Sequence, residues 1–147
     1  MGELTLPPSG SVYFDASPII FSVEKIEPYV SILKPIWRSA QVGNLSLIGS
    51  ELLLLETLVK PIQKKDTALE ESFRDLLQRS REFRLLPINT SVIEMAARLR
   101  ATVNLKTPDA IHAATALIAG CALFITHDPI FRRVSELNVS VLSDVIA

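Results

Sequence analysis

The sequence has little of what covalent cross-links and soft-metal sites require. Its single cysteine, Cys121, allows no internal disulfide, which fits a reducing compartment. One cysteine and two histidines are too few for a zinc site of the Cys/His type. Cys121 follows Gly120 at the edge of an apolar stretch, so we expect it to be a packing residue rather than a reactive thiol.

Long apolar runs and an excess of one charge are also missing. Charged residues or prolines interrupt every apolar run before it could span a bilayer, so we expect no membrane association. Residues 1–10 lack the basic flank and apolar segment of a signal peptide, and Leu6 breaks the myristoylation pattern. We expect a cytoplasmic protein with residues 1–10 as a flexible tail. The net charge of −1 gives no global attraction to nucleic acid, so a polyanion site would have to be local.

What is present is the pattern of an α/β domain. With 147 residues, of which 48% are hydrophobic, the chain is long enough for one domain with a buried core. Five short apolar runs rich in β-formers alternate with helical patterns, at residues 11–14, 45–48, 83–88, 122–125 and 139–142. This alternation predicts crossover helices and a central, mostly parallel five-stranded sheet with helices on both faces. We therefore expect one three-layer α/β/α domain over residues 11–147.

Local signals predict where the helices begin and end. Pro35 should bend or break the second helix, and Pro61 should end the third. Hydroxyl residues before a proline or at the head of a capping-box pattern predict four helix starts, namely Ser17-Pro18, Thr67-x-x-Glu70, Ser91-x-x-Glu94 and Thr107-Pro108. Gly120 should close the helix that begins at Thr107. The stretch 66–84 is the most charged and is predicted to be an exposed helix.

Two aspartates follow apolar strands. Asp15 comes directly after the first run, and Asp128 follows the fourth run in the same way, before Pro129. In open parallel sheets, ligands bind beyond the carboxyl ends of the strands, near the point where strand order reverses. The alternative is that Asp15 satisfies a turn and that Asp128 caps a helix, and a capping role for Asp128 does not exclude a second one.

Two further acids lie on predicted helices. Glu56 projects from an apolar face that includes Leu52 and Val59, where a carboxylate needs a cation or hydrogen bonds. The alternative is a helix-edge glutamate that reaches solvent. Asp109 begins a largely uncharged helix, and His112 and Thr115 follow it at intervals of three. Asp109 also suits a first turn by its charge alone, and we interpret His112 as a supporting or core histidine rather than a metal ligand or base.

Together the four acids predict a metal site. Crossover connections bring strand ends and helix starts to one edge of the sheet, where four carboxylates would repel one another unless cations neutralised them. Hard oxygen ligands without nearby cysteine favour Mg²⁺ or Mn²⁺. The predicted ligands, and with them the predicted catalytic residues, are Asp15, Glu56, Asp109 and Asp128.

The acids and their surroundings resemble the PIN-domain nucleases, and particularly the VapC-type toxins of VapBC toxin–antitoxin pairs. Four stretches carry the resemblance: residues 13–17, 50–61, 105–116 and 125–131. The third stretch, with the sequence Leu-Lys-Thr-Pro-Asp-Ala-Ile-His-Ala-Ala-Thr-Ala, is the most specific. One departure is His127, which stands where many members carry asparagine. The presence of all four acids argues against a non-catalytic member.

The resemblance implies a metal-dependent endoribonuclease that hydrolyses RNA phosphodiester bonds, a small antitoxin protein as partner, and a homodimer. Ser17, Thr107 and Thr126 would support the acids or position water. Five basic side chains are candidates for phosphate contacts, although each of them also suits a solvated surface: Lys60, Lys64, Lys65, Arg132 and Arg133.

Three other functions stay open. The first two are a PIN-like module that binds RNA or protein without cutting it and an RNA-processing nuclease without an antitoxin. The third, a phosphatase or receiver domain, fits poorly. No second aspartate stands two residues after Asp15, and such a domain leaves Glu56 unexplained.

Overall fold

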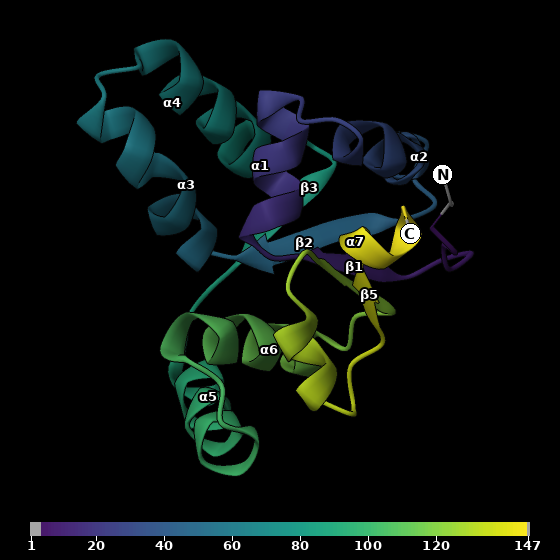
Figure 1. Cartoon of the computed structure of the whole chain (residues 1–147), viewed down its shortest axis with the longest axis vertical. Coiled ribbons are helices and arrows are strands. Elements are labelled where there is room, and N and C mark those ends of the chain that lie inside the picture. Colours follow the sequence, from purple (N-terminus) through teal and green to yellow (C-terminus); the bar gives the residue numbers. More distant parts are fainter. Residues whose placement is uncertain (1–3, 147) are drawn as a thin grey trace.

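A computed structural model describes residues 4–146 of the chain (Figure 1). The elements follow one another as β1 (Ser11–Phe14), α1 (Ala16–Glu24), α2 (Tyr29–Gln41), β2 (Ser46–Ser50), α3 (Leu52–Gln63), α4 (Thr67–Arg74), the π-helical turn η1 (Asp75–Arg79), β3 (Phe83–Leu86), α5 (Thr90–Val103), α6 (Thr107–Ala119), β4 (Leu123–Thr126), the 3₁₀ turn η2 (Pro129–Arg133), β5 (Val139–Val141) and α7 (Leu142–Val145). The predicted strands are all present, with ends shifted by one or two residues.

The five strands form one sheet in the order β3-β2-β1-β4-β5, and every neighbouring pair is parallel. Val12 in the central strand pairs with Leu47 on one side and Leu123 on the other. The chain moves outward from β1 to β3 and then returns to the other side of β1, so the strand order reverses between β1 and β4. The carboxyl ends of these two strands are where an open parallel sheet places a ligand site.

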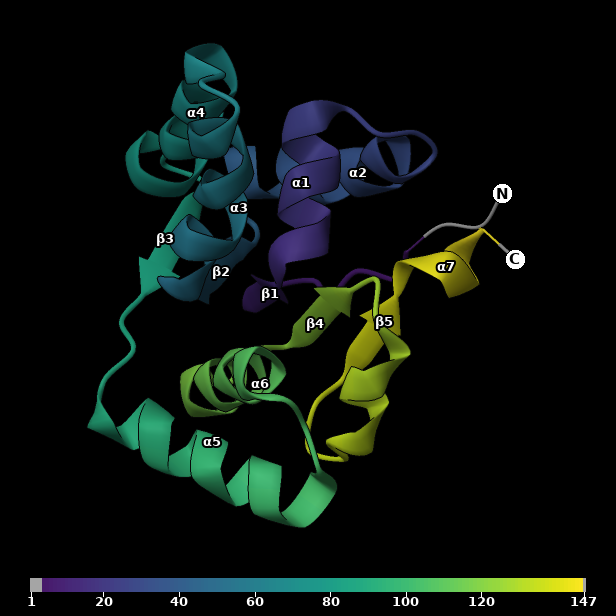
Figure 2. The ribbon, with the colours of Figure 1, turned by 60° about the vertical axis from the view of Figure 1, so that its left-hand side comes forward.

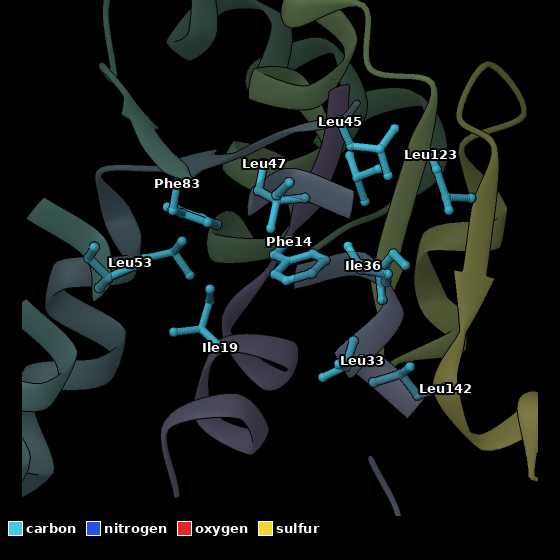
Figure 3. Close-up of a cluster of buried hydrophobic side chains, with 14 of the residues drawn as sticks. Phe14, Ile19, Leu33, Ile36, Leu45, Leu47, Leu53, Phe83, Leu123 and Leu142 are labelled. Carbon is cyan, nitrogen blue, oxygen red and sulfur yellow. The ribbon is translucent and has the colours of Figure 1, made fainter. Parts of the chain in front are cut away.

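Helices cover both faces of the sheet, which confirms the three-layer prediction. Helices α1 to α4 and α7 lie on one face, and α5, α6 and η2 lie on the other (Figures 1 and 2). The alternation along β1 explains both layers, because Val12 and Phe14 enter the first core while Tyr13 enters the second. Figure 3 shows Phe14 surrounded by side chains from β2, β3 and the helices of the first layer, among them Phe83 and Ile36.

Both interior prolines lie inside helices: α2 does not break at Pro35, and the prediction that Pro61 ends α3 was wrong. Helix α2 continues through Pro35, which is exposed and removes one backbone donor from the helix. Helix α3 passes Pro61 and ends two residues later. By contrast, Gly120 closes α6 as predicted, in the left-handed conformation with φ of 65°.

Three of the predicted starts were displaced by better caps or by the strand before them. Asp66 caps α4 by accepting from the N–H of Leu69 at 3.1 Å, and Asn89 caps α5 by accepting from Val92 at 3.1 Å. Asp and Asn cap at least as well as the Thr or Ser that follows them, so the upstream residue takes the role. Helix α1 begins at Ala16, directly after β1, which leaves Ser17 inside its first turn.

Two further boundaries differ. Thr107 is the first residue of α6, and the cap position is Lys106. The charged stretch after Asp66 is helical only to Arg79, because β3 begins at Phe83.

The expected tail falls partly on residues 1–3, which lie outside the described residues. In the remainder, Leu4 and Leu6 pack against the first core. Within residues 4–146, no helix combines the length and the apolar character that a membrane crossing requires.

Candidate active site

Asp15 lies at the carboxyl end of β1 and is buried, with 7% of its surface exposed. It occupies the cap position of α1, yet its side chain caps no backbone N–H. Instead, Thr126 at the end of β4 donates its hydroxyl to Asp15 Oδ2 at 2.6 Å. The other oxygen, Oδ1, is buried and has no hydrogen-bond partner among residues 4–146. A carboxylate oxygen left this way is a ligand position for a cation.

The pKa of Asp15 shows which groups share its surroundings. Burial is the largest influence and raises the pKa from 3.8 to about 7. The His112 ring and the Thr126 hydroxyl lower the pKa, whereas the charges of Glu56 and Asp109 raise it. Three of the predicted acids are therefore close enough to act on one another through their charges.

Glu56 is held by a chain of hydrogen bonds that crosses the domain. His112 Nε2 on α6 lies 2.6 Å from Glu56 Oε1 on α3, and His112 Nδ1 lies 2.7 Å from the Tyr13 hydroxyl on β1. A carboxylate only accepts, so Nε2 donates to it, and in the neutral ring Nδ1 accepts from the Tyr13 hydroxyl. His112 is 2% exposed and supports the acid from behind, as the sequence indicated. Burial keeps the pKa of Tyr13 well above its usual value, so this hydroxyl stays protonated.

Asp109 and Asp128 form the more open side of the site. Asp109 is in the first turn of α6, and its pKa is raised by burial first and by the charge of Asp128 second, whereas Lys106 lowers it. Asp128 is exposed and caps η2 by accepting from the N–H of Ile130 at 2.9 Å. Its own N–H donates to Thr126 Oγ1 at 3.0 Å, so one hydroxyl connects Asp128 with Asp15. Asp128 is thus a cap, and its charge acts on the site as well.

The three predicted hydroxyl residues are placed differently. Thr126 is fully buried between two of the acids, whereas Thr107 is exposed and accepts from Arg100 Nη1 at 2.7 Å. Ser17 is half-buried in the first turn of α1. The ring of His127 packs edge-on against Tyr29, with centroids 4.8 Å apart. Sequence reasoning missed the hydrogen bond between Tyr13 and His112. The available signal was that Tyr13 stands two residues before Asp15, so both side chains should face the same side of the strand.

The donor set fits a hard divalent ion. The acids offer oxygen ligands only, and buried Oδ1 of Asp15 is open to a cation. Among residues 4–146, no three His, Cys, Asp or Glu side chains are gathered closely enough to hold a metal ion as they stand. These acids could hold such an ion, whose charge would offset the repulsion between carboxylates that, after burial, contributes to the raised pKa values of Asp15 and Asp109.

Comparison with known proteins identifies the fold. The sequence profile of the PIN domain matches residues 12–137, and no curated protein matches the sequence significantly. Solved structures match over most of the chain. A structure of VapBC2 from Rickettsia felis, bound to a DNA fragment from its promoter, contains a chain with 15% identity and a TM-score of 0.70, over 89% of this chain and 98% of that one.

Two other structures show the same arrangement. A toxin–antitoxin complex from Klebsiella pneumoniae matches with 22% identity and a TM-score of 0.66, over 88% of this chain and 96% of the other. VapBC-5 from Mycobacterium tuberculosis matches with 19% identity and a TM-score of 0.55, over 90% of this chain and 97% of the other.

Proposed function

Because this chain belongs to the PIN-domain family, we propose that it is a metal-dependent endoribonuclease. The observation that supports this most directly is the buried carboxylate of Asp15, which has one oxygen without a hydrogen-bond partner among residues 4–146. Its pKa is raised by burial first and then by the charges of two neighbouring acids. Such a group is costly in a protein that never binds a cation there. The family profile spans 12–137, so it includes all four acids.

Each residue has a definable task. Asp15, Glu56, Asp109 and Asp128 would hold Mg²⁺ or Mn²⁺, and a bound ion supplies an activated water and stabilises charge on the phosphate oxygens. Thr126 orients Asp15 by its hydroxyl, which fixes the direction of the open oxygen. His112 and Tyr13 hold Glu56 against α6, which limits the rotamers of a long side chain at the site. Ser17 is proposed to position water or support the acids, whereas Thr107 is tied to Arg100.

We further propose that the protein is the toxin of a toxin–antitoxin pair. The support is the fold, since one similar structure is described as a toxin–antitoxin complex and another as a member of the VapBC family of toxin–antitoxin systems. A small antitoxin protein would then be its partner. The resemblance extends the proposal to a homodimer that acts in the cytoplasm. Any segment that covers the acids with a basic side chain would offset the same repulsion that a metal relieves.

Cleavage by the purified protein tests the nuclease. Single-stranded and structured RNA should be cut in Mg²⁺ or Mn²⁺ and not in chelator, and Asp15→Asn or Asp109→Asn should lower the rate at least about a hundredfold. The matched control is Asp66→Asn, because Asp66 caps α4 away from the site and Asn caps nearly as well. Undiminished cleavage by Asp109→Asn, or cleavage of DNA but not RNA, would overturn the assignment.

Growth tests the toxin role separately. Expression of the wild type alone should arrest growth, and expression of Asp15→Asn should not. Robust cleavage in vitro without any effect on growth would favour an RNA-processing nuclease without an antitoxin. Tight RNA or protein binding without cleavage would favour a binding module.

A further inference from the structure

A cavity of about 410 Å³ opens directly beside the acids, on the face of the sheet that α5 and α6 cover. Its lining residues come from the end of α5, the loop that joins α5 to α6, the first turn of α6 and the segment that follows β4. Its polar lining consists of Arg100, Asn104, Lys106, Asp109, Asp128 and Arg133. The lining of the cavity therefore combines two acids of the proposed active site with three cations.

The three cations come from different elements and converge by folding. Arg100 is in the last turn of α5, Lys106 precedes α6, and Arg133 ends η2. Between the first two, Asn104 adopts the left-handed conformation with φ of 56°, which ends α5 and turns the chain toward α6. This turn brings Lys106 beside Asp109, whose pKa it lowers.

Two of the cations are oriented by hydrogen bonds to uncharged groups, so their positive charge is not neutralised by these partners. Arg100 Nη1 donates to Thr107 Oγ1 at 2.7 Å, and Arg133 Nη1 donates to the Asn104 carbonyl at 3.2 Å. Neither partner is charged, and within residues 4–146 neither arginine nor Lys106 forms an ion pair with a carboxylate. Each guanidinium keeps further donors free. A guanidinium that is oriented by uncharged partners and forms no ion pair is suited to an anion.

We propose that Arg100, Lys106 and Arg133 form a phosphate subsite, which holds the backbone of a single RNA strand next to the phosphate that is cleaved. This inference rests on the proposed nuclease function. A cavity of this size admits a sugar-phosphate unit. The subsite attracts the substrate where the chain as a whole does not, since the net charge is −1. These are positioning residues, and contacts to the backbone make them independent of base sequence.

The structure also separates these cations from the other basic candidates. Lys60, Lys64 and Lys65 lie at the far end of α3 or just beyond it and do not line the cavity. Arg132 pairs with Asp144 and points to the edge of the sheet at β5. Of the five cations indicated by the sequence, only Arg133 lines this cavity.

Binding without cleavage tests the subsite. We would measure the affinity of Asp15→Asn protein in Mg²⁺ for a labelled single-stranded RNA over a range of salt concentrations. Adding Arg100→Gln, Lys106→Gln and Arg133→Gln together should weaken binding at least about tenfold. The salt slope should fall by about 0.7 for each phosphate that the protein no longer neutralises. The matched control carries Lys60→Gln, Lys64→Gln and Lys65→Gln, which remove the same charge from α3 and should leave both quantities nearly unchanged.

Two additional measurements make the test decisive. In the cleaving protein, the cavity substitutions should raise KM more than they lower kcat, and Arg133→Lys should restore part of the affinity. Arg100→Gln also removes the hydrogen bond to Thr107 and could therefore impair folding. The unfolding temperatures of all variants would reveal such a defect. If there is one, the double variant Lys106→Gln with Arg133→Gln replaces the triple variant.

The outcomes distinguish this inference from the proposed function. Equal binding by the two triple variants, or an equal loss in both, would overturn the subsite. A specific loss with the cavity variant, in a protein that never cuts RNA, would support the subsite and refute the nuclease. If the cavity variant binds RNA normally and loses binding to an acidic peptide instead, the subsite for RNA is wrong.

Discussion

Asp15 is the most deeply buried of the four acids, and its surroundings determine how its charge behaves. Within the part of the chain that the structure describes, only one of its oxygens accepts a hydrogen bond, from Thr126. In the metal-free folded protein, the pKa of this carboxyl group is therefore raised, and the group loses its proton only near neutral pH. Stability and metal affinity are linked at this residue. Deprotonation of Asp15 gives the carboxylate that can bind a cation, and the same deprotonation destabilises the metal-free fold.

The metal-free protein should lose stability as pH rises through this titration. The pKa of Asp15 is about 7 in the fold and 3.8 ordinarily, so between these values the folded state binds more protons than the unfolded state. The stabilising contribution is then complete below pH 4 and is lost as pH approaches 7 and above. In chelator, the unfolding temperature of the wild type should fall relative to that of Asp15→Asn between pH 4 and 8. A difference that is constant with pH would contradict this environment.

Thr126 is predicted to position Asp15 through its hydroxyl. Thr126→Val keeps the shape of the side chain but leaves Asp15 Oδ2 and the Asp128 N–H without their partner, which should cost about 1–3 kcal/mol of stability. The titration described above should also move to higher pH. Thr126→Ser, which keeps the hydroxyl, is the control and should retain most of the stability in urea unfolding. Equal loss in both variants would indicate packing rather than the hydrogen bonds.

At the scale of elements, the position of Glu56 depends on how closely α3 approaches the sheet. The turn from β2 into α3 is short, and Ser50 Oγ accepts from the N–H of Leu52 at 3.0 Å. Gly49 makes this approach possible, because an added Cβ would stand 2.5 Å from Leu53 Cδ1 and 3.1 Å from the Phe14 carbonyl oxygen. The absence of a side chain at Gly49 therefore allows α3, the helix of Glu56, to pack closely against the sheet.

Gly49→Ala should destabilise the fold by about 1–3 kcal/mol, because Leu53 and Phe83 would have to move in a packed core. It should also weaken metal-dependent stabilisation, since α3 would move away from His112. Urea unfolding with and without Mg²⁺ measures both effects. Ser46→Ala, at the exposed start of the same strand, should change stability by less than about 0.5 kcal/mol. A neutral Gly49→Ala would mean that α3 adjusts freely.

The sequence was sufficient to predict the elements and their order, because a buried parallel sheet requires apolar runs and crossover helices that are visible in it. Helix ends were less predictable. Two good caps can stand next to each other, as Asp66 and Thr67 do, and prolines lie inside helices both at an exposed position, Pro35, and at a buried one, Pro61. These choices depend on tertiary surroundings that periodicity does not contain.

The same limit applies to the site. Local pattern was sufficient to single out the four acids as candidates, since each interrupts an apolar surface or follows a strand, and the structure places them near one another. Their role as ligands stays a prediction. The partners of His112 could not be predicted, because Tyr13 and Glu56 lie 99 and 56 residues away along the chain. The cavity cations Arg100 and Lys106 could not be predicted either. In the sequence they resemble ordinary solvated residues, and only the folded loop between α5 and α6 brings them to the cavity.

At the scale of the whole molecule, folding gathers charged side chains at one edge of the sheet, although the net charge of the chain is close to zero. The net charge is −1, yet the carboxyl edge of the sheet combines four acids with the three cations of the cavity. The acids come from β1, α3, α6 and the end of β4, so an ion that binds them would connect both helical layers to the sheet. Metal binding should therefore be visible in global unfolding, not only in local measurements.

Thermal unfolding of five proteins tests whether the acids form one ion site. In several millimolar Mg²⁺ or Mn²⁺, the wild type should melt higher than in chelator, by about 2.7 kcal/mol of stability when the metal is at a hundred times its Kd. For a domain of this length, each kcal/mol is about 2–4 °C. Each substitution that neutralises one acid should remove most of the gain: Asp15→Asn, Glu56→Gln, Asp109→Asn and Asp128→Asn. In chelator, the variants should be as stable as the wild type or more stable, because a repelling charge is gone, and Asn at position 128 still caps η2. If the metal shifts all five proteins equally, or none of them, the four residues do not share an ion, and they act only as caps and turn residues.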